Sequence, residues 1–350
     1  MEKIIREGLK KGKVEKLKGD FSYMRFAAAL RGIERGTAII GKRVVWGYPH
    51  IKRIFSLEKG VLRNLSGDIY AEEKIDGFNV RVAAIDGRIC AFTRGGFLDS
   101  FVTEKAREMK LEKFFRKHPG HVLCGEMIGN TPYTSPAKDF DVQFFVFDID
   151  TGDGSYLAPQ EKYDVLQDYG IRCVPRLGKA KDMKELKKLV LAVLKGKKEG
   201  MVFRSSDGRS TVKYVTPFTD VDDIDKSSMM FFDMPIGFYY QRILRSAFFI
   251  DEFGLDHDEY AEKLGKAFYK GLIKAIRDVK DGREIDQEFE ILIRDKKIWD
   301  DIGKHMSREV GLEKLWEKEE KGKTRIRFRK IYRKTTKELS SYAKGKGTID

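Results

Sequence analysis

The apolar positions along the chain predict short strands in its first two thirds and longer helices after them. Strand-forming residues at 69–74 run into the stretch 72–77, Glu-Glu-Lys-Ile-Asp-Gly, and a second alternating run follows. An Asp-Gly pair between two such runs predicts a β-hairpin. Because side chains two apart on a strand share a face, Glu72, Lys74 and Asp76 are expected on one side. A lysine between two carboxylates is costly to bury unless the groups are paired or used.

The other elements expected up to residue 232 are mostly strands, joined by turns. A helix is expected where Tyr23, Phe26, Ala27 and Leu30 form an apolar stripe. This order of elements favours an α+β fold built from antiparallel hairpins over regular βαβ units. The remaining expected strands are 37–40, 43–46, 51–55, 89–93, 122–127, 142–149, 200–204 and 210–215, and the helices are 57–65, 102–117, 163–169 and 183–194.

The pattern changes after about residue 232. Residues 236–250, 257–279 and 284–306 show helical spacing with charged outer faces, which predicts a helical module. Residues 311–350 carry a strong excess of Lys and Arg over Asp and Glu. Within that tail Arg325, Arg327 and Arg329 alternate with apolar residues, so we expect one face to lie on protein while the arginines meet phosphates.

The net charge of +14 and pI near 9.4 predict a polyanionic partner, either nucleic acid or an anionic surface. The chain has no apolar run near 20 residues and its first residues lack a signal-peptide core, so a cytoplasmic, non-membrane protein is expected. Cys90, Cys124 and Cys173 lie far apart and predict buried thiols in a reducing compartment rather than a zinc site. Scarce Asn and Gln beside abundant Lys and Glu are typical of a thermophile.

Residues 74–77, Lys-Ile-Asp-Gly, resemble motif I (KxDG) of the covalent nucleotidyltransferases, which are DNA ligases, RNA ligases and mRNA capping enzymes. One such motif is weak evidence, but five further stretches resemble later motifs in the family order. That family usually has two lysines in motif V, and this chain has only Lys213 there. The further stretches are 93–96 (Ser-Arg-x-Gly motif), 125–127 (motif III), 145–149 (motif IIIa), 199–204 (motif IV) and 212–214 (part of motif V).

Within that superfamily the chain most resembles the homodimeric archaeal ATP-dependent RNA ligases, over nearly its whole length. The features it shares with them are Glu-Glu before the lysine, Asn79 where DNA ligases place Arg, an N-terminal extension and a helical region after motif V. The resemblance implies an antiparallel-sheet, ATP-grasp-like nucleotidyltransferase domain within an α+β fold. The implied divisions are an N-terminal extension (1–65), the nucleotidyltransferase domain (66–232), a helical dimerisation domain (233–310) and a basic C-terminal region (311–350).

The resemblance also implies a reaction in three steps. A lysine takes AMP from ATP, AMP passes to an RNA 5′-phosphate, and a 3′-hydroxyl then seals the strand, with circular single-stranded RNA as one product. A DNA ligase and a GTP-dependent capping enzyme remain alternatives, and a non-catalytic RNA-binding protein is a third. Nucleotide preference and the joining of RNA against DNA would separate them.

The resemblance assigns a role to each candidate residue. Lys74 is the expected nucleophile, and because a free lysine amine is mostly protonated at neutral pH, nearby positive charge must favour its neutral form. Arg204, Lys213 and bound Mg²⁺, or Mn²⁺, are expected to supply that charge. The other assignments are Asp76, Asn79 and Glu126 for the ribose, Arg94 for ribose or an incoming 5′-phosphate, Phe147 (or Phe145) for stacking on adenine, Glu72 or Glu73 for the adenine amino edge, Gly77 as part of the nucleotide site and Glu199 for the metal.

Overall fold

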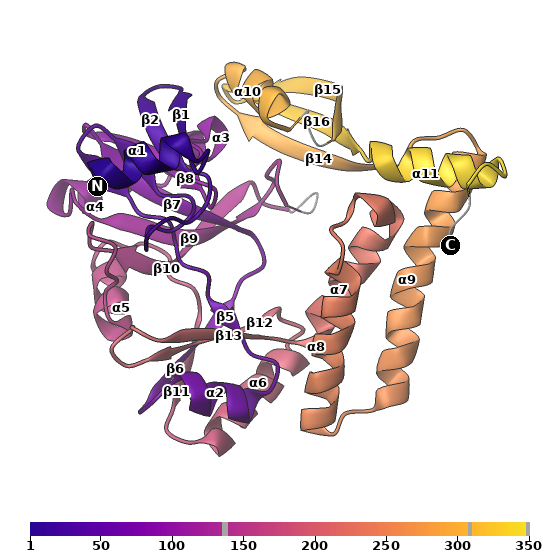
Figure 1. Ribbon diagram of the computed structural model, residues 1–350, viewed down its shortest axis with the longest axis horizontal. Helices are drawn as coiled ribbons and strands as arrows, with labels where there is room; N and C mark the ends of the chain where they lie inside the picture. Colours follow the sequence, from indigo (N-terminus) through magenta and orange to yellow (C-terminus); the bar gives the residue numbers. More distant parts are fainter. Residues whose placement is uncertain (135–138, 307–309, 348–350) are drawn as a thin grey trace.

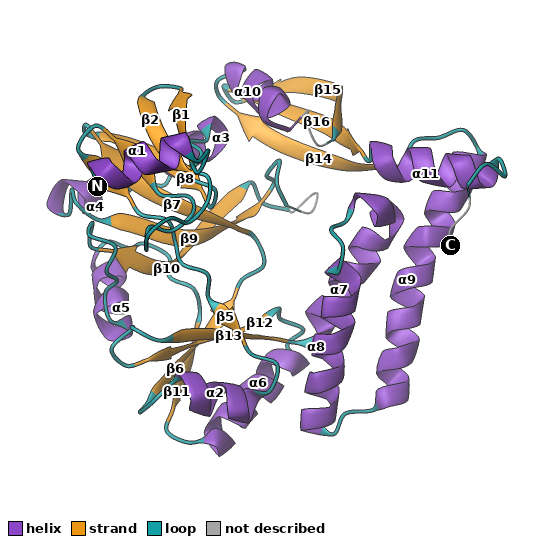
Figure 2. Cartoon of the chain, viewed as in Figure 1, coloured by secondary structure: helices purple, strands orange, loops and turns teal. Residues whose placement is uncertain are grey.

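The computed structural model describes residues 1–134, 139–306 and 310–347, and two β-sheets form its centre (Figure 1). An antiparallel sheet has the strand order β10-β9-β7-β8, and a larger sheet has the order β11-β6-β12-β13-β5. Helices pack against these sheets (Figure 2), so the expected α+β fold is confirmed. The strands are β5 (Lys52–Arg53), β6 (Ile69–Lys74), β7 (Phe78–Ile85), β8 (Arg88–Thr93), β9 (Val122–Gly129), β10 (Val142–Asp150), β11 (Arg176–Ala180), β12 (Gly200–Ser205) and β13 (Thr211–Val215).

The helices of this central part match the expected positions with one change. The expected helix at 102–117 is divided into two helices, because the chain turns at Lys110, which has a positive φ. The helices are α2 (Leu57–Asn64), α3 (Ser100–Arg107), α4 (Glu112–Lys117), α5 (Pro159–Asp168) and α6 (Met183–Lys195).

The expected hairpin at Asp76-Gly77 is wrong, because β6 and β7 belong to different sheets. Strand β6 pairs with β11 and β12, whereas β7 pairs with β8 and β9. The local turn signal is overridden by strands that come from far along the chain, which residue spacing does not reveal. A Cβ at Gly77 would lie 2.4 Å from the carbonyl oxygen of Met127, so only glycine fits where the chain crosses from one sheet to the other.

The N-terminal residues form a third, antiparallel sheet, which lies beside the sheet that contains β7–β10. The hairpin of β3 (Ala38–Ile40) and β4 (Arg43–Val45) is as predicted, but the helix expected at residues 23–30 is a strand. Its apolar spacing comes from two different cores, because Tyr23 packs on Phe92 and Phe26 packs in the core that contains Val14. The remaining elements here are α1 (Glu2–Lys10), β1 (Val14–Lys18) and β2 (Ser22–Phe26).

The boundary expected at residue 65 does not separate two structural units. Strand β5 is the edge of the five-stranded sheet, where it runs parallel to β13, and α2 packs in the same core. Arg81, buried on β7, donates hydrogen bonds to the carbonyl oxygens of Gly36 (2.9 Å), Trp46 and Thr93 (2.8 Å). The N-terminal segment is therefore an integral part of the nucleotidyltransferase unit.

The C-terminal third begins with helices, but the helix expected at 284–306 is a strand followed by a short helix. Apolar residues at every second position, Phe289, Ile291 and Ile293, are buried, which is the period of a strand. Strand β14 pairs with β16, so the boundary expected at residue 310 divides one sheet. The elements are α7 (Pro217–Ser227), the 3₁₀ helix η1 (Ser228–Asp233), α8 (Phe238–Phe253), α9 (His257–Lys280), β14 (Asp286–Ile293), α10 (Lys297–Met306), β15 (Gly311–Glu320), β16 (Lys323–Ile331) and α11 (Arg333–Ala343).

The C-terminal sheet packs on the nucleotidyltransferase unit near α3. Lys105 of α3 is buried between them, and its ammonium donates to the carbonyl oxygen of Leu292 (2.5 Å) and the carboxylate of Asp141 (2.8 Å). Glu104 accepts hydrogen bonds from the backbone N–H groups of Arg294 and Asp295. Helices α8 and α9 stand to one side of this assembly (Figure 1).

The basic tail does not present a face of free arginines. On β16, Ile326 and Phe328 are buried as expected, but the three arginines between and beside them lie opposite acidic residues of β14 and β15. The expectation that they meet phosphates stays a prediction, and the compensation of their charges within the sheet counts against it. The pairs are Arg325 with Glu290 and Glu320, Arg327 with Glu288, and Arg329 with Asp286 and Glu313.

The cysteines and the helix lengths can be compared with what the sequence predicted. Cys90 and Cys124 are buried free thiols and Cys173 is partly buried, without disulfides among them. Within the residues the structure describes, no helix is both long and apolar enough to span a bilayer.

Candidate active site

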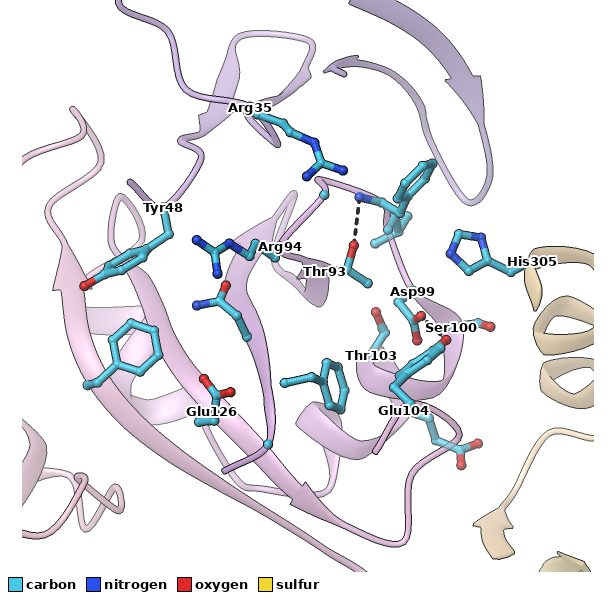
Figure 3. Close-up of a pocket in the computed structure, with 18 of the residues that line it drawn as sticks. Arg35, Tyr48, Thr93, Arg94, Asp99, Ser100, Thr103, Glu104, Glu126 and His305 are labelled. Atoms are coloured by element: carbon cyan, nitrogen blue, oxygen red, sulfur yellow. Dashed lines mark hydrogen bonds between the residues drawn. The ribbon is translucent and has the colours of Figure 1, made fainter. Parts of the chain in front are cut away.

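A large cavity of about 1440 Å³ lies between the two sheets and collects most of the residues chosen from the sequence. Figure 3 shows Arg94 and Glu126 in it, together with Arg35 and Tyr48 from the N-terminal segment. At its other end it reaches His305 of α10, so this helix closes one side. The candidate residues among those that line it are Glu72, Glu73, Lys74, Gly77, Asn79, Arg94, Glu126, Phe147, Arg204 and Lys213.

The expected nucleophile is held by the expected metal ligand. Lys74 lies opposite Gly200 in the pairing of β6 with β12, which places Glu199 beside it, and the ammonium of Lys74 is bonded to Oε1 of Glu199. The other oxygen, Oε2, is buried without a hydrogen-bond partner. Burial raises the pKa of Glu199 to about 7, although Lys74 opposes that shift. This carboxylate therefore has one oxygen without a partner, and it changes between its protonated and ionised forms near neutral pH.

Glu126 and Asn79 lie opposite each other on β9 and β7, within the cavity. Burial raises the pKa of Glu126 to about 8, and Oδ1 of Asn79 is buried without a hydrogen-bond partner. A carboxyl group and an amide with unused hydrogen-bonding capacity suit the two hydroxyls of a ribose. Asp76, the third residue chosen for the ribose, is exposed at the crossing between the sheets and is not among the cavity residues.

Arg204 does not point a free charge at the cavity. Its guanidinium donates to Glu72 (2.7 Å) and Asp148 (2.9 Å), and Lys162 of α5 donates to Glu72 (2.5 Å). Burial opposes ionisation of Glu72, but Arg204 and Lys162 outweigh it and lower its pKa to about 2. Two acids and two bases thus form a neutral, buried network. The catalytic role expected for Arg204 stays a prediction, and the pairing of its charge within the protein favours a positioning role.

The same network positions the ring expected to stack on adenine. Lys162 donates to the carbonyl oxygen of Phe147 (2.7 Å), and Tyr48 donates to Asp148 (2.5 Å). The ring of Tyr48 meets that of Phe147 edge to face, with centroids 4.9 Å apart. Phe147 lines the cavity and Phe145 does not, so the geometry favours the first of the two candidates. Sequence analysis missed Tyr48 and Lys162, which no local pattern distinguishes.

Neither carboxylate chosen for the adenine amino edge is free. Glu72 is occupied by the buried network, and Glu73 is bonded to Lys198. Recognition of the adenine amino group by one of them stays a prediction, and the ion pair would have to rearrange for Glu73 to take that role.

Within the described residues, six cations that line the cavity make no hydrogen bond or ion pair through their side chains, namely Lys18, Arg35, Arg53, Arg94, Lys213 and Lys297. Arg94 and Lys213 were expected, whereas Arg35 and Arg53 come from the N-terminal segment and were missed. In Figure 3 Arg35 and Arg94 enter the same part of the cavity. Burial lowers the pKa of Lys213 to about 8, with Arg53 and Lys74 adding to the effect. Arg35 and Arg94 are exposed, whereas Arg53 and Lys213 are partly buried. Unpaired cations at the wall of a cavity suit a polyphosphate ligand.

The described residues contain no group of three or more His, Cys, Asp or Glu side chains that could enclose a metal ion. Mg²⁺ is commonly bound by one or two carboxylates together with phosphates of the substrate, so a complete protein cage is not required. The buried, unpartnered Oε2 of Glu199 fits such a site, because an anionic oxygen without a partner is costly unless a cation meets it.

The chain resembles known proteins over nearly its whole length. Residues 67–215 match the family model of RNA ligases, and residues 227–346 match that of the C-terminal region of the ligase Pab1020. An uncharacterised protein of Methanocaldococcus jannaschii is 29% identical over 344 residues, which is 91% of this chain and 87% of the relative.

Two solved structures share the fold. A protein of Aquifex aeolicus, provisionally named an ATP-dependent DNA ligase, superposes with a TM-score of 0.93 at 29% identity, over 100% of both chains. A structure named archaeal ATP-dependent RNA ligase, form 1, has a TM-score of 0.90 at 27% identity and covers 98% of this chain and 96% of its own.

The two-sheet fold, with Lys74 in its cavity, is that of the nucleotidyltransferase-type ligases. Within that class, residues 67–215 belong to the RNA ligase family, and the chain combines them with a C-terminal region of the ligase Pab1020 type.

Proposed function

We propose that the chain is an ATP-dependent RNA ligase that works through a lysyl-AMP intermediate on Lys74. The observation that carries this proposal is that Lys74, whose ammonium is bonded to Glu199, lines a cavity together with Phe147 and unpaired cations. The family match supports RNA as the substrate, and the structures named ATP-dependent RNA ligases support ATP.

In the first step the lone pair of Lys74 Nζ attacks the α-phosphorus of ATP, and the bond to the β-phosphate oxygen breaks. The ammonium must first lose a proton, and Glu199 Oε1 is bonded to it as an acceptor. A bound Mg²⁺ or Mn²⁺ would neutralise phosphate charge and compete with the Lys74 ammonium for Glu199. The unpaired Lys213 would help to stabilise charge that develops on phosphate oxygens.

In the second step an oxygen of the RNA 5′-phosphate forms a bond to the same phosphorus, and the Lys74 nitrogen leaves with its electron pair and regains a proton. In the third a 3′-hydroxyl attacks the RNA phosphate and AMP leaves. Arg94 is the residue we assign to the incoming 5′-phosphate, because it enters the cavity unpaired (Figure 3). If both ends belong to one strand, the product is a circle.

The first test is covalent labelling with ATP or GTP that carries a labelled α-phosphate, on wild type and Lys74→Ala. ATP-specific label that the variant loses is the expected result. GTP-specific label would favour a capping enzyme, and absence of label from folded protein would contradict nucleotidyl transfer. 5′-phosphorylated RNA and DNA strands of one sequence then separate an RNA ligase from a DNA ligase, an alternative that the provisional name of the Aquifex aeolicus relative favours.

We also propose that two copies associate through α8 and α9. Helix α7 packs on both, whereas α8 and α9 make little contact with each other. Large apolar side chains are exposed on both, which is typical of an interaction surface. A cytoplasmic location is a separate proposal, and the free cysteines support it. The exposed apolar residues are Tyr240, Ile243, Leu244 and Phe248 on α8 and Tyr269, Ile273 and Ile276 on α9.

Light scattering tests the dimer. Wild type is expected at twice the monomer mass at micromolar concentration, and Leu244→Glu combined with Ile273→Glu is expected at the monomer mass. The matched control is Leu62→Glu, since Leu62 is also exposed but lies on α2. A monomeric wild type would contradict the proposal.

A further inference from the structure

Four residues stand in one row across the five-stranded sheet. Val202 of β12 lies opposite Glu72 of β6 on one side and Lys213 of β13 on the other, and Lys213 lies opposite Arg53 of β5. Residues in register project from the same face of a sheet, and all four line the cavity. Lys74, two positions from Glu72, shares that face. Arg53 is therefore a cavity residue, and it lies at the opposite end of this row from β6, the strand that carries Lys74.

The charge of Arg53 is not compensated within the described residues. Its Nε is buried without a partner, and its side chain makes no hydrogen bond or ion pair there. The acids whose charges act on it are Asp220, Glu199 and Asp223. Each already pairs with another cation, which is Arg245, Lys74 and Arg242 respectively. A partly buried guanidinium with unused donors is costly unless an anion occupies the space beside it.

Lys213 adds to the free-energy cost of leaving Arg53 without an anion beside it. It is also unpaired, and it lies next to Arg53 because the backbone N–H of Ile54 donates to the carbonyl oxygen of Lys213 (3.0 Å) in the parallel ladder. Two like charges side by side on adjacent strands destabilise the protein when nothing binds them. A phosphate would satisfy both, because it accepts hydrogen bonds from a guanidinium and an ammonium together.

The place of this pair follows from the geometry of the reaction. In transfer to phosphorus the entering and leaving atoms lie in line on opposite sides of it. Lys74 reaches the phosphorus from β6, whereas Lys213 and Arg53 are two and three strands away, roughly 10 and 14 Å at the usual strand spacing. A phosphorus atom within reach of Lys74 and above β12 would therefore have the pair on the side away from the nucleophile.

We propose that Arg53, together with Lys213, binds the phosphate that lies opposite Lys74 about the reacting phosphorus. This proposal rests on the proposed ligase function. In the first step that phosphate is the β-phosphate of ATP, which leaves with the electron pair of the broken P–O bond as pyrophosphate. In the second it is the RNA 5′-phosphate, whose oxygen supplies the pair for the new P–O bond while the P–N bond to Lys74 breaks. Arg53 forms no covalent bond and is a substrate-binding residue.

The test compares Arg53→Ala, Arg53→Lys and the control Lys52→Ala. Lys52 is the neighbouring residue on β5, is exposed, and points to the opposite face. Three quantities are measured: the ATP concentration for half-maximal enzyme–AMP formation, the pyrophosphate concentration that reverses it, and the rate of AMP transfer from preformed enzyme–AMP to 5′-phosphorylated RNA.

Arg53→Ala is expected to raise both half-maximal concentrations and to slow AMP transfer, each by about tenfold or more, because a charge-assisted contact is lost. Arg53→Lys is expected to recover part of each, since it restores charge but not the forked donors. Values equal to those of Lys52→Ala would overturn the proposal. If Arg53→Ala slows only AMP transfer, Arg53 does not bind the β-phosphate of ATP, and that part of the proposal is overturned. Arg53 would then bind only the RNA 5′-phosphate. Absence of label in wild type would instead contradict the proposed function itself.

Discussion

Glu199 holds the ammonium of Lys74 although 125 residues separate them along the chain. The contact exists because β12, which Glu199 precedes, pairs with the strand that ends at Lys74. Lys74 is part-exposed and has no role in the core, so its replacement should affect chemistry rather than folding.

Lys74→Ala and Lys74→Arg are both expected to abolish covalent labelling by ATP. Alanine removes the nucleophile, whereas arginine keeps a cation beside Glu199 but has no amine that can be deprotonated near neutral pH. Thermal unfolding within a few degrees of wild type would show that both variants fold. Label retained by either variant would place the nucleophile elsewhere.

The pH dependence of enzyme–AMP formation should report on Glu199. Burial raises the pKa of this carboxyl to about 7, and the ionised form is the one that accepts a proton or meets a metal ion. The rate should therefore be present above pH 7 and fall as pH drops through it. Because Mg²⁺ favours the ionised form, a higher Mg²⁺ concentration should move this fall to lower pH. In Glu199→Gln the Mg²⁺-dependent shift should disappear, and a wild-type profile that ignores Mg²⁺ would contradict the assignment.

Sequence analysis succeeded where the information is local. The strands that carry Lys74, Glu126 and Arg204 follow from short apolar runs, and these three motif residues line one cavity. It failed where the outcome depends on which strands pair. The Asp-Gly turn predicted a hairpin, yet the chain there passes between two sheets.

The sequence likewise showed which side chains are charged, but not which side chains they pair with. Arg204 was expected to supply positive charge for Lys74, and the arginines of β16 were expected to meet phosphates. All of them pair with carboxylates of the protein. Arg53 carried no signal, because a parallel pairing with β13 cannot be read from its neighbours. Compensated and uncompensated arginines can be distinguished only after the sheets are assembled.

Arg204→Ala tests the positioning role. The variant leaves Glu72 and Asp148 buried without their shared cation, which should lower the free energy of unfolding by about 3–5 kcal/mol. The control is Arg209→Ala, because Arg209 is 88% exposed beside Asp207 and should change stability by no more than about 0.5 kcal/mol. Urea unfolding measures both. Unchanged stability with lost activity would restore a direct catalytic role for Arg204.

Arg327→Gln tests whether the basic tail binds RNA. Arg327 lies between β14 and β15 and pairs with Glu288, so its loss should leave the salt dependence of RNA binding unchanged. Arg94→Gln removes an unpaired cation from the cavity and should reduce the slope of log K against log salt by about 0.7, the value for one phosphate contact on a single strand. Filter binding at several salt concentrations compares them. A reduced slope for Arg327→Gln would return the tail to the RNA-binding surface.

Glu126→Gln should separate stability from activity. Burial raises the pKa of Glu126 to about 8, so between its ordinary value of 4.5 and pH 8 the folded state holds a proton that the unfolded state lacks. The free energy of unfolding of wild type should therefore fall as pH rises through that window, by at most about 1.4 kcal/mol per pH unit from this group. Glutamine carries no such proton. The variant should be more stable than wild type at pH 8.5, with the advantage shrinking towards pH 5, while ATP labelling weakens. Glu112→Gln, at an exposed position of α4, is the control and should show neither effect. An advantage that is equal at both pH values would mean that Glu126 is ionised in the folded protein throughout.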